Sequence, residues 1–269
     1  MIGSFTLIKN EAAWIAGHLH SWLHLLDQMV FFDGNSTDGT LEIIEAIKHE
    51  HPHGYKVKLV RDKDPKDLQD DYVRLFNECM WSLDTDFAFF LHPDMMCAEF
   101  PKLDLGDCIA ASVRIESFAG EPDGELFRIV GRGEVWKNIY RLRNPDLGAH
   151  YWGHYGHAME DVYFRDITGD EHVHHAAAVS RYPYVVKDSG IRVLHFSDVR
   201  PPRRRFERMV KCLLNNDHTL EMAEKRALRH PRVTLKGDAD FAFEPAKYPA
   251  DFISAKSKYQ HLAKEFSIA

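Results

Sequence analysis

Three apolar segments in the first hundred residues each end in acidic or amide side chains. The first ends in Asn10 and Glu11, the second in Asp33 and the third in Asp94. In an open α/β sheet, ligands bind outside the carboxyl ends of the parallel strands, so three such strand ends from one sheet converge on one crevice. This arrangement predicts a site for a nucleotide and a divalent metal ion.

The spacing of apolar residues predicts that strands and helices alternate over this part of the chain. The expected strands are residues 4–8, 29–32, 56–60 and 87–91. The expected helices are residues 14–26, 41–47 and 68–83, the first of which repeats apolar residues at helical spacing. This order implies a mainly parallel sheet with right-handed crossovers.

The pattern changes after residue 100. Strand-like runs without intervening helices are expected at residues 109–118, 126–130 and 135–142, followed by a Gly- and His-rich loop at 144–157. A mixed region of this kind extends the sheet and carries the second half of the site. From residue 201 the pattern turns helical through residue 228, and we expect this tail to pack back on the core.

Charge and cysteine usage narrow the class of protein. The formal net charge of −7 gives no global attraction to nucleic acid or an anionic membrane, so contact with phosphate must come from the local basic patch at residues 200–208. The four cysteines form no CxxC pair, which predicts reduced thiols. The N-terminus lacks a signal-peptide pattern, and no apolar stretch approaches the roughly 18–20 residues of a membrane span. A cytoplasmic location is therefore expected.

Three motifs in order resemble a known enzyme family. The strand ends read Lys9-Asn10-Glu11, then Asp33 within an Asp-Gly-Asn-Ser-Thr-Asp-Gly-Thr run, then Leu-His-Pro-Asp around His92 and Asp94. They are similar to the Lys-Asn-Glu, Asp plus Gly-Ser-Thr-Asp-Gly-Thr and Asp-x-Asp elements of the family 2-type glycosyltransferases with the GT-A fold. That class is nucleotide-sugar-dependent and usually inverting. The first acid of Asp-x-Asp is replaced here by His92.

The resemblance implies an α/β, GT-A-like (Rossmann-like) fold with a mainly parallel sheet flanked by helices, a mixed β region and a helical C-terminal segment. Residues 1–100 are then the nucleotide-binding half, residues 101–199 the acceptor-side half with mixed strands and a loop, and residues 200–269 a helical extension.

The resemblance also implies a set of donor-binding residues. They are Asn10, Glu11, Asp33, Asn77, His92, Arg200 and Arg203. Asp33 offers a fixed acceptor for an N–H group of the nucleotide base, although an Asp-Gly turn leading into a capped helix explains the same residue. Asp38 and Thr40 fit a turn and a helix start. Arg200 and Arg203 can form charge-assisted bonds to a diphosphate, and a solvated basic face is the alternative.

Metal and catalytic roles follow from the same resemblance. Asp94 is expected to bind Mn²⁺ or Mg²⁺, and His195, in a late strand, is the expected second ligand. His92 is expected to touch the ribose or a phosphate. The base that deprotonates the acceptor hydroxyl is assigned to Asp161 or Glu160, with His157 as the fallback.

The sequence thus predicts a metal-assisted, inverting, hexosyltransferase-like enzyme that moves a sugar from a nucleoside-diphosphate sugar, UDP-linked by preference, to a hydroxyl group. The acceptor, whether glycan, lipid, protein or modified nucleobase, is not identified. One alternative is a nucleotidyltransferase, which would need a Gly-rich basic first loop. Another is a non-catalytic carbohydrate- or nucleic-acid-binding protein on the same fold, favoured by His92 and by the basic patch.

Overall fold

A computed structural model gives the fold of the chain. It describes residues 1–61, 75, 78–80, 82–106, 108, 110–121, 124–131, 134–142, 151–153, 162–165, 171–174, 186–214, 219–235 and 241–263. Its main element is a ten-stranded sheet with the order β13-β7-β6-β8-β4-β1-β2-β3, to which β12 and β5 are joined off this path. A separate three-stranded sheet has the order β11-β10-β9.

The first half of the sheet is parallel, as the sequence predicts. Its strands are β1 (Ile2–Ile8), β2 (Gln28–Asp33), β3 (Val57–Arg61) and β4 (Phe87–Phe90). β1 lies at the centre and pairs in parallel with β2 and β4, and β2 pairs in parallel with β3. The connecting helices include α1 (Ile15–Trp22) and α2 (Thr40–Glu50), and a short 3₁₀ helix, η1 (Gly54–Lys56), precedes β3.

Helices cover both faces of this parallel half because its strands are apolar on both sides. On β2, Met29 and Phe31 pack with residues of α1 and α2, whereas Val30 and Phe32 pack on the opposite face with Leu75 and Met80. Successive side chains of a strand point to opposite faces, so a continuous apolar run needs a cover on each. Leu75 and residues 78–80 are helical and lie within the expected helix at 68–83. The predicted α/β class is confirmed.

The second half of the sheet is mixed, also as predicted. β6 (Ala110–Gly120), β7 (Leu126–Gly131) and β8 (Glu134–Arg141) form antiparallel pairs, and β8 joins them to β4. β12 (Val186–Val199) runs parallel to β6 and antiparallel to β5 (Met95–Glu99). β12 therefore brings residues near position 195 beside the turn that follows β4.

Several strands escape the sequence pattern. These are β5, β9 (Tyr151–Gly153), β10 (Val162–Arg165), β11 (Glu171–His174) and β13 (Phe241–Ala246). β9 falls inside the segment expected to be a loop, so that expectation is wrong for its three residues. β13 carries Pro245, which is tolerated because β13 is the edge strand next to β7. The pairing of β5 and β13 involves strands about a hundred residues away in the sequence, which local periodicity does not reveal.

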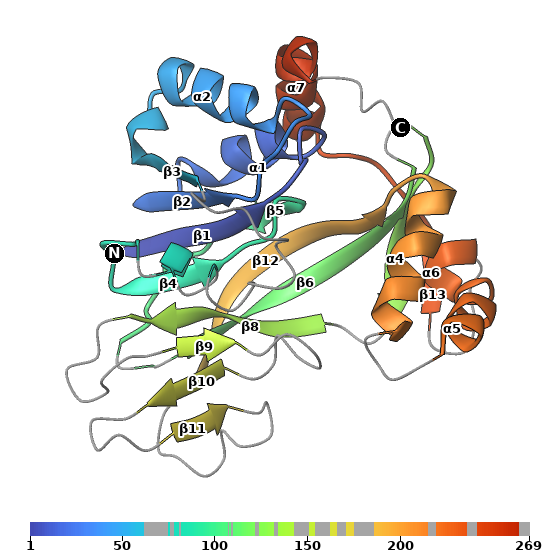
Figure 1. Cartoon of the computed structure of the whole chain (residues 1–269). Helices are drawn as coiled ribbons and strands as arrows, with labels where there is room; N and C mark the ends of the chain where they lie inside the picture. The colour runs from blue at the N-terminus through green and yellow to red at the C-terminus, as the bar shows by residue number, and fades with distance from the viewer. Residues whose placement is uncertain are drawn as a thin grey trace.

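The C-terminal tail is helical around β13. Its helices are α4 (Pro202–Leu214), α5 (Leu220–Ala227), α6 (Pro231–Thr234), α7 (Ala250–Tyr259) and a short 3₁₀ helix, η3 (Gln260–Leu262). Figure 1 shows α7 beside α1 and α2 at the top of the view, and α4 grouped with α5 and α6 at the right, around β13. In the residues that the structure describes, no helix is both long and apolar enough to cross a membrane.

Stacked aromatic rings fix α7 against α1 and the sheet. Trp14 stacks on Phe196 and on Phe252, with ring centroids 5.4 Å apart in both pairs. Phe118 of β6 stacks on Phe196 at 5.0 Å. Aromatic pairs at these separations stabilise a fold beyond their buried area. The tail therefore packs back on the core, as predicted.

The close approach of α7 to α1 generates a stability prediction. A methyl group added at Gly17 would lie 2.2 Å from Cδ2 of Phe252, so Gly17→Ala forces the two helices apart. We expect a loss of about 1–3 kcal/mol in the free energy of unfolding, despite the higher helix propensity of alanine. Urea unfolding of the wild type and of Gly17→Ala measures this difference in the free energy of unfolding. In a Phe252→Ala background the same change should cost less, and a Gly17→Ala protein as stable as wild type would contradict this packing.

Candidate functional site

The loops that follow β1 and β2 are held together by hydrogen bonds between side chains and backbone. The backbone N–H of Asn10 donates to Ser36 Oγ at 2.9 Å, and the backbone N–H of Thr37 donates to the side-chain oxygen Oδ1 of Asn10 at 2.8 Å. Asn10 has a φ of 59°, a left-handed conformation that asparagine tolerates better than most residues. The predicted donor-binding residue Asn10 thus has a structural role that joins the two loops.

Asp38 and Thr40 complete this connection. The Ala12 N–H donates to Asp38 Oδ2 at 3.0 Å, and the Glu11 N–H donates to Thr40 Oγ1 at 2.8 Å. Asp38 Oδ1 accepts from the Thr40 N–H at 3.0 Å, and Thr40 is the first residue of α2. Both residues therefore serve the turn and the helix start, as the sequence indicates.

Asp33 lies at the carboxyl end of β2 with only 2% of its surface exposed. Its two carboxylate oxygens are 3.1 and 3.3 Å from the backbone nitrogen of Ser36, which donates to them. This is the Asp-initiated turn that was the alternative to nucleotide binding. The turn uses one N–H group, so contact between Asp33 and a nucleotide base stays a prediction.

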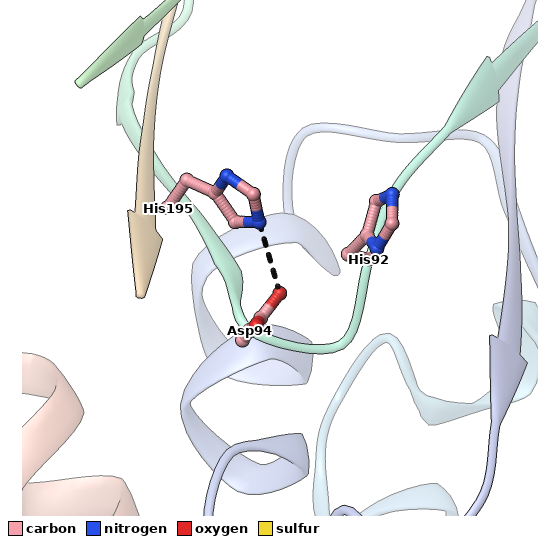
Figure 2. A group of neighbouring side chains, drawn as sticks. All are labelled: His92, Asp94 and His195. Carbon is pink, nitrogen blue, oxygen red and sulfur yellow. Dashed lines mark ion pairs between the residues drawn. The ribbon is translucent and has the colours of Figure 1, made fainter. Parts of the chain in front are cut away.

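His92, Asp94 and His195 form a compact group at the end of β4. One ligand atom from each residue lies within 4.8 Å of the other two. Asp94 Oδ1 is 3.5 Å from His195 Nε2, and both side chains are 5% exposed. Figure 2 shows Asp94, from the turn after β4, and His195, from β12, facing each other, with His92 beside them. The structure therefore brings the two predicted metal ligands together and adds His92.

Backbone pairing sets the position of this group. The Met95 N–H donates to the His92 carbonyl at 3.0 Å and closes the turn, and the Phe196 N–H donates to the Asp94 carbonyl at 3.0 Å. His195 lies opposite Met95 in the β12–β5 pair. The segments that carry Asp94 and His195 are therefore linked by main-chain bonds.

A buried histidine anchors the same turn to α1. The carbonyl of Met95 lies 2.8 Å from His18 Nδ1 and accepts from Trp22 Nε1 at 3.0 Å. His18 is fully buried, and this burial lowers its pKa to about 4. Its ring is therefore neutral at pH 7, and Nδ1 is the nitrogen that carries the proton donated to Met95. No sequence pattern pointed to His18, because a histidine on an apolar helix face is common.

Arg200 connects the group to a cleft. Its guanidinium lies 3.7 Å from Asp94 Oδ2 and donates to the Ser197 carbonyl at 2.9 Å. The cleft has a volume of about 580 Å³, and the side chains that line it include Lys9, Asn10, Glu11, Asp38, Arg200, Arg204, Lys256 and Tyr259. The loop after β1 and Arg200 thus share one cavity. The contributions of Lys256 and Tyr259, which belong to α7, were not predicted, because no pattern reveals which side of the core the tail contacts.

The structure does not bring Arg203 to this group. Its side chain is 84% exposed and pairs with Glu207 one helical turn later, at 2.9 Å. Arg205, in contrast, is buried and donates to the carbonyls of Gly120 and Arg200, which fixes the start of α4. Asn77, Glu160, Asp161 and His157 lie outside the described residues.

The donor atoms of the group suit a divalent transition-metal ion. One buried carboxylate and two imidazoles supply one oxygen and two nitrogens, and imidazole is a good ligand for such ions. In the part of the chain that the structure describes, no other group of three His, Cys, Asp or Glu side chains has this arrangement. Arg200 adds a positive charge at the rim, suited to an anion.

Comparisons with known proteins give only distant likenesses. No family model matches the chain. The small ribosomal subunit proteins uS3 of Streptococcus gordonii and Streptococcus pneumoniae are 24% identical over 125 residues, which cover 38% of this chain. The match covers 51% of these proteins, so the chain spans about half the length of the curated relatives it matches.

Two solved structures are similar at low level. The mannosyltransferase PcManGT from Pyrobaculum calidifontis, in complex with GDP-Man and Mn²⁺, has a TM-score of 0.45 and 13% identity, with 97% of this chain and 69% of that chain covered. S. aureus TarS 1–349, in complex with UDP, has a TM-score of 0.34 and 16% identity, with 46% and 37% covered. These values do not assign the chain to a family.

The buried His18 makes stability depend on pH. Its pKa falls from 6.5 in the unfolded chain to about 4 in the folded one, so the unfolded state binds more protons between these values. The contribution of the neutral His18 ring to the free energy of unfolding is fully present above pH 6.5. It falls by about 3 kcal/mol as the pH drops to 4. In His18→Asn, whose amide replaces the Nδ1 donor, unfolding free energy should fall less over this range. Urea unfolding at several pH values, with exposed His49→Asn as the control, measures it; parallel curves for wild type and His18→Asn would contradict it.

Proposed function

We propose that this chain is a GT-A-like glycosyltransferase of the family 2 type that moves a sugar from a nucleoside-diphosphate donor, UDP-linked by preference, to a hydroxyl acceptor. The observation that carries the proposal is the continuity of the site. The loop containing Asn10 and Glu11 lines the same cleft as Arg200, and Arg200 lies 3.7 Å from Asp94 of the His-Asp-His group. We take the loop after β1, Arg200 and the turn after β4 as one region for a nucleoside diphosphate and a metal ion.

The donor binds along this continuous surface. Asp33, at the carboxyl end of β2, is the acceptor assigned to the nucleotide base, and Asn10 and Glu11 supply polar groups that line the cleft. Arg200 is a planar, permanently charged donor that suits phosphate oxygens. Asn77 completes the assigned set. Arg203 is assigned only a secondary role in donor binding, since its exposed side chain pairs with Glu207.

Asp94 and His195 would hold the metal ion, Mn²⁺ or Mg²⁺ as the resemblance implies. Such an ion would supply positive charge that stabilises the leaving nucleoside diphosphate. Arg200 shares this work from the rim of the cleft, because its guanidinium already faces the Asp94 carboxylate. The backbone bonds between the two ligand segments keep Asp94 and His195 in place before the donor arrives.

The transfer step is a single displacement. The acceptor oxygen forms a bond to the anomeric carbon while the bond from that carbon to the diphosphate oxygen breaks, with inversion. The acceptor proton passes to a carboxylate base, assigned to Asp161 or Glu160 with His157 as the fallback. The nucleoside diphosphate leaves with the electron pair of the broken bond.

Nucleotide titration tests the proposal. We expect one of UDP, GDP and CDP to bind in the presence of Mn²⁺, and Asp94→Asn to weaken that binding by at least about tenfold, since loss of even an outer partner of a metal ligand costs about 10–100-fold. Calorimetry measures the affinity with and without Mn²⁺. The exposed Asp84→Asn is the control and should match wild type.

Absence of binding by every nucleotide, with and without metal, would refute the transferase. Nucleic-acid binding that weakens steeply with salt would then favour the non-catalytic alternative through the basic patch at residues 200–208.

A further inference from the structure

We infer that His92, Asp94 and His195 form a three-ligand metal site that takes a transition-metal ion and discriminates against Mg²⁺. His92 occupies the position at which the resembled family carries an acid, and it lies beside Asp94 and His195 with a ring nitrogen within 4.8 Å of a ligand atom of each (Figure 2). The inference rests on the proposed function only for the statement that this metal site helps to bind the nucleotide-sugar donor. Its metal chemistry is measurable on the free chain without any nucleotide.

The distances fit one ion. Ligand atoms at about 2.0–2.2 Å from a metal lie roughly 3–4 Å apart. Asp94 Oδ1 and His195 Nε2 are already separated by 3.5 Å, and all three ligand atoms lie within 4.8 Å of one another. The rings of His92 and His195 are inclined by 49° with centroids 5.6 Å apart, so they lie close to each other without stacking.

Main-chain bonds keep the site in shape without an ion. The turn that carries His92 and Asp94 is closed by the Met95 N–H, and the Met95 carbonyl is held by His18 and Trp22 from α1. The Phe196 N–H bonds to the Asp94 carbonyl, which places His195 next to Asp94. A preorganised site loses little conformational entropy on binding, so metal affinity does not have to wait for a substrate.

The donor set decides which ion is preferred. Mg²⁺ requires near-octahedral oxygen coordination and keeps most of its waters. Imidazole nitrogens suit divalent ions of the first transition row. Two nitrogens and one oxygen therefore favour Co²⁺ and Zn²⁺ over Mn²⁺, and all three over Mg²⁺, in the usual order of affinities. Arg200 lies nearer the other Asp94 oxygen, Oδ2, which leaves Oδ1 toward His195.

The decisive variant is His92→Asp, which restores the acid of the resembled pattern and exchanges a nitrogen ligand for an oxygen. We expect the wild-type chain, treated with chelator and dialysed, to bind one Co²⁺ with visible absorption bands and to bind Mg²⁺ at least about 100-fold more weakly. In His92→Asp this preference for Co²⁺ over Mg²⁺ should fall at least about tenfold, and the bands should change in energy. Calorimetry and absorption spectroscopy measure both.

Two further variants keep the test sharp. His92→Gln removes the imidazole at similar size, so it should lose Co²⁺ affinity without gaining Mg²⁺ affinity, even if the added charge of His92→Asp disturbs folding. His49→Asp makes the same charge change at an exposed position of α2 and should leave metal binding unchanged. Far-UV circular dichroism confirms that each variant is folded.

The outcomes separate this inference from the proposed function. Equal affinity of the wild type for Co²⁺ and Mg²⁺, no metal binding by the free chain, or an unchanged preference in both His92 variants would overturn it. Failure of every nucleotide to bind, with Co²⁺ binding and its His92 dependence intact, would refute the transferase and leave the metal site standing. Nucleotide binding with no metal preference would do the reverse.

Discussion

The carbonyl group of Met95 is the acceptor on which the candidate site depends. It accepts hydrogen bonds from Nδ1 of the buried His18 and from Nε1 of Trp22, both of which belong to α1. These bonds fix the turn that carries His92 and Asp94 to the core of the parallel half, where α1 packs against the sheet. A desolvated, neutral imidazole is therefore part of the architecture that holds a buried carboxylate in place.

The alternation of side chains along β12 links the site to the hydrophobic core. His195 faces Asp94, and the next residue, Phe196, points to the other side and stacks with Trp14 and Phe118. Packing of Phe196 against these rings therefore fixes the position of β12, and with it the position of the His195 side chain relative to Asp94. Burial of an aromatic ring and positioning of a polar ligand are achieved by two consecutive residues of one strand.

The parallel half and its polar strand ends were predictable because long apolar runs, helical spacing and turn residues are local signals. Asp94 and His195 could be named from motifs, and the structure brings them together. The orientation of His92, the exposure of Arg203 and the lining of the cleft by Lys256 could not be, because each depends on packing between segments far apart in sequence. β5 was missed for the same reason, since its partner β12 lies about a hundred residues later.

That separation has a kinetic consequence. Met95 and His195 are neighbours only because β5 and β12 pair, so the ligand group cannot exist until the chain has closed the long loop between them. Contacts of such high sequence separation form slowly, whereas β1, α1 and β2 can assemble from nearby residues. We therefore expect the loops after β1 and β2 to take their shape before His195 reaches Asp94.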